Sequence, residues 1–297
     1  MKKKKKNIWD GNTIYILWFI FYFMLTAYIL SLFTLNIITS TLITLGIYAV
    51  LMPLAFTPAG EKLFKLLNGV RPLYTNHEKE KILPLFHAVH KDVTKKKKSM
   101  RKDIELCISD SLIPNAFAMG ERTIVVTKGL MESMTEEQIK GILVHEYGHI
   151  VHGDTKAVVY TFIGNGILNI TMVIVRKVMQ VVVKVMDSFC IGMIGTAFFG
   201  ILGASLRIAL FIIEAMAFVV QEAGEIILMA KSRRNELCAD YFAFRMNYGE
   251  ELISALYDFE LMSNGQTLTI QEQLKATHPH TARRIWCLES WMGISIK

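Results

Sequence analysis

The stretch "HEYGHIVHGD", residues 145–154, carries three histidines and a glutamate within ten residues. It begins with the pattern H-E-x-x-H, in which two histidines one helical turn apart hold a zinc ion and the glutamate acts on water. At about 100° per residue, His145 and His149 project from one face of a helix, while Glu146 is offset from both. The stretch therefore predicts a helix with two metal ligands and a general base.

The residues before this stretch predict where its helix begins and what precedes it. Thr135 is a suitable N-cap, and Gln138 three residues later completes a capping box. Further upstream, residues 78–93 are typical of a helix around Pro84. Short strands are expected at residues 104–108, 115–118 and 123–127, with turn sequences between them. A small antiparallel β-sheet is the simplest arrangement of these strands.

A catalytic zinc site needs a third protein ligand. His152 is the nearest candidate, but the long zincin pattern requires glycine at this position and histidine at position 155, where this chain has threonine. Glu236 in "SRRNELCAD" (residues 232–240) is the better candidate, because Asp240 follows four residues later on the same helical face. We expect Glu236 to bind one Zn²⁺ per chain and Asp240 to accept the other ring N–H of a ligating histidine. Whether His152 contributes stays open at this point.

The chain has 297 residues, of which 52% are hydrophobic. Residues 11–60 contain no charged side chain, which is enough for two membrane crossings of about 20 residues each. We place these crossings at residues 13–33 and 35–56, after a basic tail at residues 1–12. The whole segment, 13–56, is too long for the apolar core of a cleaved signal peptide.

A second apolar region, residues 157–230, predicts another membrane hairpin. Its apolar segments run from 157 to 175 and from 188 to about 213, and between them lie Arg176, Lys177, Lys184 and Asp187. Arg207 and Glu214 lie within or at the end of the last segment, where charges either reach the interface or face protein. The alternative is a buried apolar helix pair in a water-soluble domain.

The formal net charge of +7 does not by itself indicate a nucleic-acid-binding protein. The lysines at residues 2–6 precede a membrane crossing, where such residues mark the cytoplasmic side and meet anionic head groups. The basic run at residues 95–102 has no interleaved aromatic side chains to stack on bases. We therefore expect a lipid bilayer, and no nucleic acid, among the partners.

The two remaining polar blocks, residues 57–156 and 231–297, are expected to form one catalytic domain. They hold the metal ligands on either side of the second apolar region, so both must lie on the same side of the membrane. That region must then cross an even number of times. Because the basic tail marks the cytoplasmic side, we expect a multi-pass protein of the cell membrane with a cytoplasmic catalytic domain.

Four motifs occur in the order "NAFA" (115–118), "HEYGHIVHGD", "SRRNELCAD" and "THPHTARRI" (277–285). Together with apolar hairpins before the first and between the second and third, they resemble the HtpX family of integral-membrane zinc metalloproteases, which is related to the type 1 CAAX prenyl proteases. The resemblance covers nearly the whole chain. It implies a mainly α membrane protein with transmembrane helices and a helical gluzincin-type catalytic domain.

The resemblance also implies roles for residues that spacing alone does not assign. Asn115 and His278 match positions thought to contact the substrate backbone or the tetrahedral intermediate, and both carry N–H groups that can donate to an oxyanion. Arg284 matches a recurrent arginine that is either structural or substrate-facing. The basic runs and His280 depart from the family pattern and could alter substrate access.

The activity implied is endopeptidase cleavage of polypeptides, among them membrane or misfolded proteins, in protein quality control and stress response. Glu146 would take a proton from the attacking water and return it to the leaving amine. One alternative is a narrow-specificity processing protease. Another is a catalytically silent, zinc-stabilised membrane scaffold, although such proteins commonly lose the base that this chain keeps.

Overall fold

A computed structural model describes residues 11–34, 36–98, 100–189, 192–263 and 281–294 of the chain. It divides into two compact units. The first combines Met1–Met52 with Tyr160–Ile227, and the second combines Pro53–Val159 with Leu228–Lys297. We call them the helical unit and the α/β unit.

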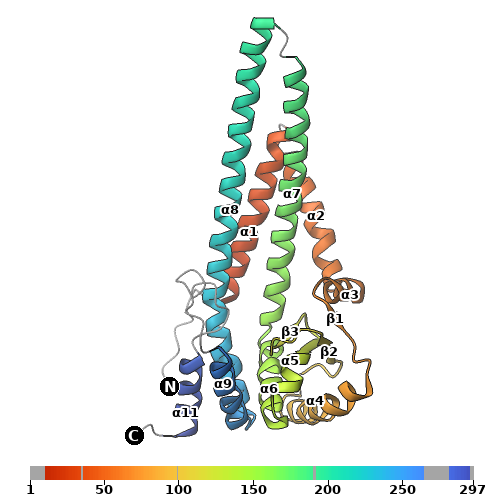
Figure 1. Ribbon diagram of the computed structural model, residues 1–297, viewed down its shortest axis with the longest axis vertical. Helices are drawn as coiled ribbons and strands as arrows, with labels where there is room; N and C mark the ends of the chain where they lie inside the picture. Colours follow the sequence, from red (N-terminus) through yellow and green to blue (C-terminus); the bar gives the residue numbers. More distant parts are fainter. Residues whose placement is uncertain (1–10, 35, 99, 190–191, 264–280, 295–297) are drawn as a thin grey trace. The chain divides into compact units, whose positions relative to one another are not determined.

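The helical unit is built from α1 (Gly11–Thr34), α2 (Ile37–Ala55), α7 (Asp154–Ser188) and α8 (Gly192–Arg245), of which the last three also extend into the α/β unit (Figure 1). Three segments of the described helices are long and apolar enough to cross a membrane: Ile37–Ala55, Ile163–Ser188 and Ala197–Val220. A shorter apolar segment, Leu17–Leu32, lies in α1.

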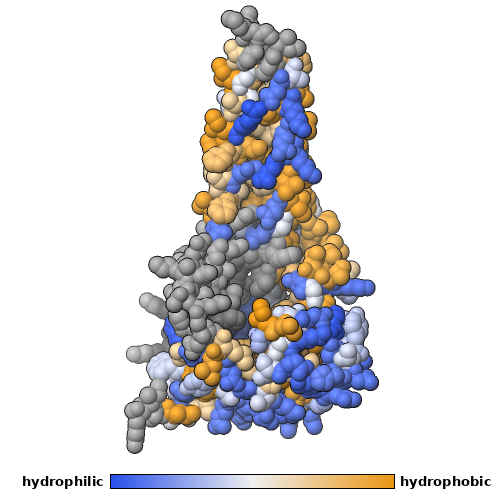
Figure 2. All heavy atoms as spheres, viewed as in Figure 1, coloured by the Kyte–Doolittle hydropathy of each residue, from blue (hydrophilic) through white to orange (hydrophobic). Residues whose placement is uncertain are grey.

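The helices of this unit pack through a small apolar core and leave most of their hydrophobic side chains exposed. Tyr22 of α1 is 1% exposed and lies against Gly164 of α7. The core is completed by Ile29, Leu168, Met172, Val175 and Ala217. Hydrophobic residues cover much of the outer surface of these helices (Figure 2), as expected where lipid is the solvent. The prediction of a mainly α membrane protein is confirmed.

The second apolar region differs from its predicted layout. Residues 176–187, expected to separate two apolar segments, continue α7 without a break, because they contain neither proline nor glycine to end a helix. Their charges pair across the hairpin. Nε of Arg176 lies 2.6 Å from Oε1 of Glu214, and Nη2 of Arg207 lies 2.8 Å from Oδ2 of Asp187. Residues 176–187 thus lie inside the candidate span Ile163–Ser188 and do not separate two spans.

The α/β unit contains a sheet of four strands: β1 (Val70–Arg71), β2 (Glu105–Ser109), β3 (Ala116–Met119) and β4 (Thr123–Thr127). Their order is β1-β2-β4-β3. The prediction of a purely antiparallel sheet is wrong for one pair, because β2 and β4 are parallel. The chain reverses direction after β2 and again after β3, so β4 runs in the same direction as β2. Since β4 then inserts between its two predecessors, it pairs in parallel with the first and antiparallel with the second.

Alternate residues of the strands face two different neighbours. Leu106, Ile124 and Val126 belong to the main core, which also contains the apolar face of α6 (Glu136–His152). Cys107, Met119 and Val125 lie on the opposite face, where Phe64 of α3 (Pro58–Leu67) packs against them. The sheet is thus held between α6 on one side and α3 on the other, with β3 at its edge.

Capping residues define the helices around the sheet. The predicted capping box of Thr135 and Gln138 is confirmed at the start of α6, which ends at Gly153 with a positive φ of 73°. Thr75 and Glu78 form a second capping box that the sequence analysis did not identify, so α4 begins earlier than predicted. The bounds of the other helices are Asn76–Lys96 for α4, Lys128–Ser133 for α5, Gly249–Ser263 for α9 and Thr281–Met292 for α11.

Candidate metal centre

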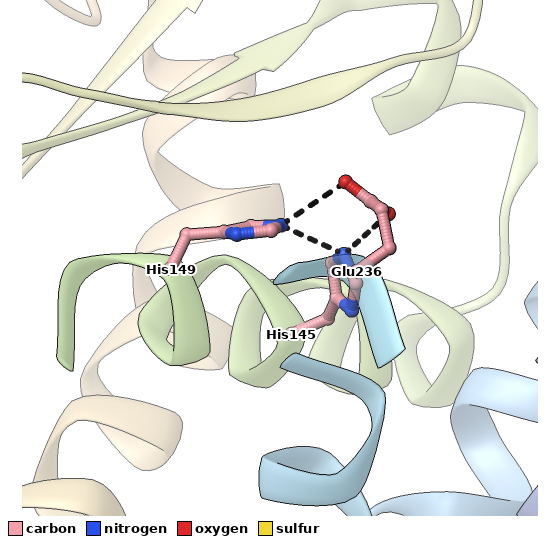
Figure 3. Close-up of side chains that lie close together, drawn as sticks. All are labelled: His145, His149 and Glu236. Carbon is pink, nitrogen blue, oxygen red and sulfur yellow. Dashed lines mark hydrogen bonds and ion pairs between the residues drawn. The ribbon is translucent and has the colours of Figure 1, made fainter. Parts of the chain in front are cut away.

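Two helices bring three of the predicted ligands together within the α/β unit. His145 and His149 project from α6, and Glu236 projects toward them from α8 (Figure 3). The two Nε2 atoms are 3.2 Å apart, and each lies 3.4 Å from one oxygen of Glu236. The three residues offer ligand atoms that all lie within 4.8 Å of one another.

The close approach of α6 and α8 depends on a glycine. A Cβ added to Gly148 would lie 2.9 Å from Cα of Ala239, closer than side-chain atoms pack against a backbone. Because both residues lack large side chains, the helix backbones meet between the histidine pair and the glutamate. The pattern H-E-x-x-H leaves this position free, so its glycine has a packing reason that the sequence analysis did not recognise.

A carboxylate orients each imidazole ring. Oδ1 of Asp240 lies 2.9 Å from Nδ1 of His145, and Oδ2 of Asp154 lies 3.1 Å from Nδ1 of His149. An ionised carboxylate only accepts, so each Nδ1 carries the hydrogen and each Nε2 of a neutral ring presents a lone pair. Two such nitrogens and a carboxylate then converge on one point, which fits a cation with a zinc-type donor set.

The pKa values of the two histidines point to the same conclusion. Burial alone would lower the pKa of His149, but hydrogen bonds to Asp154 and Glu236 outweigh it and raise the pKa to about 10. Burial and Arg284 act to lower the pKa of His145, and Asp240 and Glu236 again reverse the sign. The site therefore favours positive charge between these groups, whether protons or a metal ion supply it.

Arg284 is buried, and two carboxylates contact its guanidinium. Its Nε and Nη2 atoms donate to the two carboxylate oxygens of Asp240 at 2.9 and 2.7 Å. Its Nη1 atom also lies 3.3 Å from Oε2 of Glu236. Burial would raise the pKa of Asp240, but Arg284 and His145 outweigh this and keep it lowered. Arg284 thus keeps ionised the carboxylate that orients His145.

Glu146 reaches the sheet edge from the same helix. The backbone N–H of Ala118 in β3 donates to its Oε2 atom at 2.8 Å, although the side chain is buried. The backbone N–H and C=O groups of residues 115 and 117 point toward β4, so those of Ala116 and Ala118 point to the free edge of the sheet. Glu146 and the unpaired edge of β3 consequently face one another.

The other predicted site residues are placed less centrally. Asn115 has an exposed side chain, while its backbone is held by Thr127. His152 ends α6, its ring packs against Phe242, and it is not part of the ligand group. His278 lies outside the described residues. Asp154 was not predicted, although it lies within the same ten-residue stretch and carries a carboxylate, the usual partner of a ligating histidine.

Comparison with known proteins agrees with this arrangement. The family model described as peptidase family M48 matches residues 84–292, more than half of the chain. This chain belongs to peptidase family M48. Its matched region includes every described residue of the candidate metal centre.

Curated relatives of this M48 chain carry HtpX names. A "Protease HtpX homolog" of Sulfurovum sp. (strain NBC37-1) is 31% identical over 202 residues, which cover 60% of this chain and 65% of the relative. Another, of Desulfotalea psychrophila, is 26% identical over 206 residues, covering 63% of this chain and 67% of the relative. The chain thus spans about two thirds of the length of these relatives. The resemblance to the HtpX family is confirmed.

A solved structure was also compared with this M48 chain. Ste24p of S. mikatae is 18% identical in sequence, with a TM-score of 0.48, and the comparison covers 96% of this chain and 66% of that one.

Proposed function

We propose that this M48 chain is a membrane-bound, zinc-dependent endopeptidase that hydrolyses peptide bonds of membrane or misfolded proteins in quality control. The observation that carries the proposal is the convergence of His145, His149 and Glu236 on one point beside Glu146. Two imidazoles and one carboxylate are a ligand set of catalytic zinc sites, which keep a further position open.

His145, His149 and Glu236 would hold the ion, and Asp240 and Asp154 would keep the imidazoles in the ligating tautomer. When bound, zinc supplies a Lewis acid that acidifies water and polarises a carbonyl. Glu146 accepts the proton of the attacking water and passes it to the leaving amine. The N–H of Ala118 holds one oxygen of this carboxylate, which leaves Oε1 for the proton.

A substrate in extended conformation would pair with the free edge of β3, where Ala116 offers its backbone N–H and C=O and Ala118 offers its C=O. Main-chain pairing makes few demands on sequence, in keeping with varied polypeptide substrates. We assign Asn115, directly before this strand, and His278 to substrate or transition-state contacts, as the family resemblance implies.

The decisive experiment replaces Glu146 by glutamine in the full-length chain and measures both zinc content and cleavage of an unfolded protein. The amide keeps the shape but cannot accept a proton, so we expect unchanged zinc and a loss of activity of about 100-fold or more. Glu137→Gln is the matched control, because this glutamate is exposed on the same helix. Activity equal to wild type in Glu146→Gln would instead point to the scaffold alternative or, where cleavage is seen, to a contaminating protease.

Two narrower parts of the proposal need their own measurements. A processing protease would cleave one or a few sites, so product mapping from several unrelated unfolded proteins separates it from a broad endopeptidase.

For localisation, we propose the cell membrane, with residues 57–156 and 231–297 forming one cytoplasmic domain. A cysteine introduced at exposed Lys79, in a chain without its native cysteines, should resist a membrane-impermeant thiol reagent in intact cells. Labelling there would refute the orientation.

A further inference from the structure

Helix α3 (Pro58–Leu67) presents its leucines outward and two of its three charged side chains inward, the reverse of a helix that packs on a protein core. Leu63, Leu66 and Leu67 are exposed, and Leu66 is 75% exposed. At about 100° per residue they occupy one face, while Glu61 and Lys65 lie on the opposite one. The outward face of α3 is therefore an apolar surface that needs a partner.

The inward face of α3 is already occupied by the sheet. Phe64 packs on the apolar cluster of the sheet, and Lys65 forms an ion pair with Glu105 of β2. Glu61 lies beside Gly120 at the β3–β4 turn, where an added Cβ would be 3.2 Å from its Oε1 atom. These three contacts fix the rotation of α3 about its axis, so the leucines cannot turn inward.

The position of α3 in the chain identifies the partner. It follows the candidate membrane span Ile37–Ala55 after only two residues, Phe56 and Thr57, so its first turn lies within about 10 Å of the end of that span. Oγ1 of Thr57 donates to the carbonyl of Leu54 at 2.6 Å and accepts from the N–H of Gly60 at 3.2 Å. Gly60 also leaves no room for a Cβ against Leu54 and Ala55. The corner between α2 and α3 is thus tightly built.

We propose that the face formed by Leu63, Leu66 and Leu67 lies in the head-group region of the bilayer and anchors the α/β unit to the membrane surface. Leucines on one face of a helix that directly follows a membrane span are suited to the boundary between head groups and acyl chains. Exposed Lys62 at the border of this face can meet anionic head groups.

Anchoring α3 would also anchor the sheet, because three contacts join them. The edge of β3 and the β3–β4 turn would then stay close to the membrane surface. This consequence rests on the proposed peptidase function, under which it favours substrate segments that emerge from the bilayer. The anchoring itself does not depend on catalysis and can be measured without it.

The test uses the full-length chain with its four native cysteines replaced by alanine, one new cysteine labelled with the environment-sensitive dye NBD, and vesicles of phosphatidylcholine and phosphatidylglycerol. Leu66→Cys is the test variant. Leu261→Cys is the control, because Leu261 in α9 is 69% exposed and does not adjoin a candidate span. Vesicles carry a nitroxide either near the glycerol end or near the methyl end of an acyl chain, and a thermal unfolding transition like that of the wild-type chain verifies the fold of each variant.

We expect blue-shifted emission at position 66, with quenching about twofold or more stronger by the shallow nitroxide than by the deep one. Position 261 should show water-like emission and little quenching. Water-like, unquenched emission at position 66 would overturn the proposal. Equal quenching of the dyes at residues 66 and 261 would also overturn it. Blue-shifted emission that neither nitroxide quenches, together with disulfide-linked dimers of Leu66→Cys, would also overturn it and identify a second copy of the chain as the partner.

Discussion

Nδ1 of His145 lies 2.9 Å from Oδ1 of Asp240, a carboxylate that is completely buried and bound by Arg284. The pair fixes which nitrogen of the imidazole carries the hydrogen, and so directs the Nε2 lone pair toward His149 and Glu236. The orientation of one ligand thus depends on a residue that does not itself lie in the ligand group.

Asp240→Asn should lower the zinc affinity by about 10- to 100-fold, because the amide no longer enforces the ligating tautomer. Competition with a zinc chelator measures this change. Asp154→Asn should have a smaller effect, since the Asp154 side chain is 17% exposed and water can replace it. Asp92→Asn, an exposed change on α4, is the control. An unchanged affinity in Asp240→Asn would show that the tautomer does not depend on this contact.

Glu236→Ala should remove zinc from the purified protein, whereas His152→Ala should retain about one zinc per chain. The reason is geometric: Glu236 faces both Nε2 atoms, and His152 packs against Phe242 outside the ligand group. Metal analysis of the two variants decides between them. Zinc lost from His152→Ala and kept by Glu236→Ala would mean that the third ligand is misassigned.

Gly148→Ala should weaken zinc binding and destabilise the α/β unit by about 1 to 3 kcal/mol, because the new Cβ forces α6 and α8 apart. Zinc affinity and thermal stability are measured together. Gly141→Ala, whose Cβ would crowd the backbone of Leu252, should lower stability while leaving affinity near wild type. Gly166→Ala has no atom within 4 Å and should change neither. Equal losses of affinity in Gly141→Ala and Gly148→Ala would indicate general destabilisation only.

Arg284→Gln should destabilise the fold by about 3 to 5 kcal/mol, because it leaves the buried carboxylates of Asp240 and Glu236 without their cation. Neighbouring Arg283 is exposed, so Arg283→Gln should stay within about 0.5 kcal/mol of wild type. Thermal unfolding in detergent compares the two. If added zinc fully restores the thermal stability of Arg284→Gln, the charge of the ion replaces that of the arginine. The large loss of stability expected here would then be wrong.

Stability should fall at acidic pH through Glu78. The Arg71 guanidinium, 2.7 Å away, outweighs burial and lowers the pKa of Glu78 to about 2 from an ordinary 4.5. A carboxyl with a lowered folded pKa stabilises the fold above its unfolded pKa, and this stability, about 3 kcal/mol, is lost as pH falls from about 4.5 toward 2. Glu78→Gln should lack that part of the pH dependence, and exposed Glu80→Gln should keep it. Identical acid profiles for the two variants would contradict the assignment.

Local signals in the sequence predicted much of the catalytic region. The capping box predicted the start of α6, the run of β-branched residues predicted the bounds of β4, and the two helical motifs predicted three side chains that lie together. The pairing of β2 with β4 was not predictable in this way, because strand pairing depends on tertiary packing. Strand β1 was not predicted either, because its two residues are too few to give a recognisable pattern. The contact of Arg284 with Asp240 joins residues 44 positions apart, and no local pattern encodes it.

The backbone contact between Gly148 and Ala239 also bears on which ions the centre can hold. That contact and the flanking carboxylates set the spacing of the donor atoms, so the protein fixes how far apart the ligating atoms lie. Imidazole and carboxylate donors accept several divalent transition metals. Zinc has no colour, but cobalt bound by the same residues would absorb visible light. That absorption would report directly on the geometry of the ligands and on any molecule that binds at the remaining coordination position.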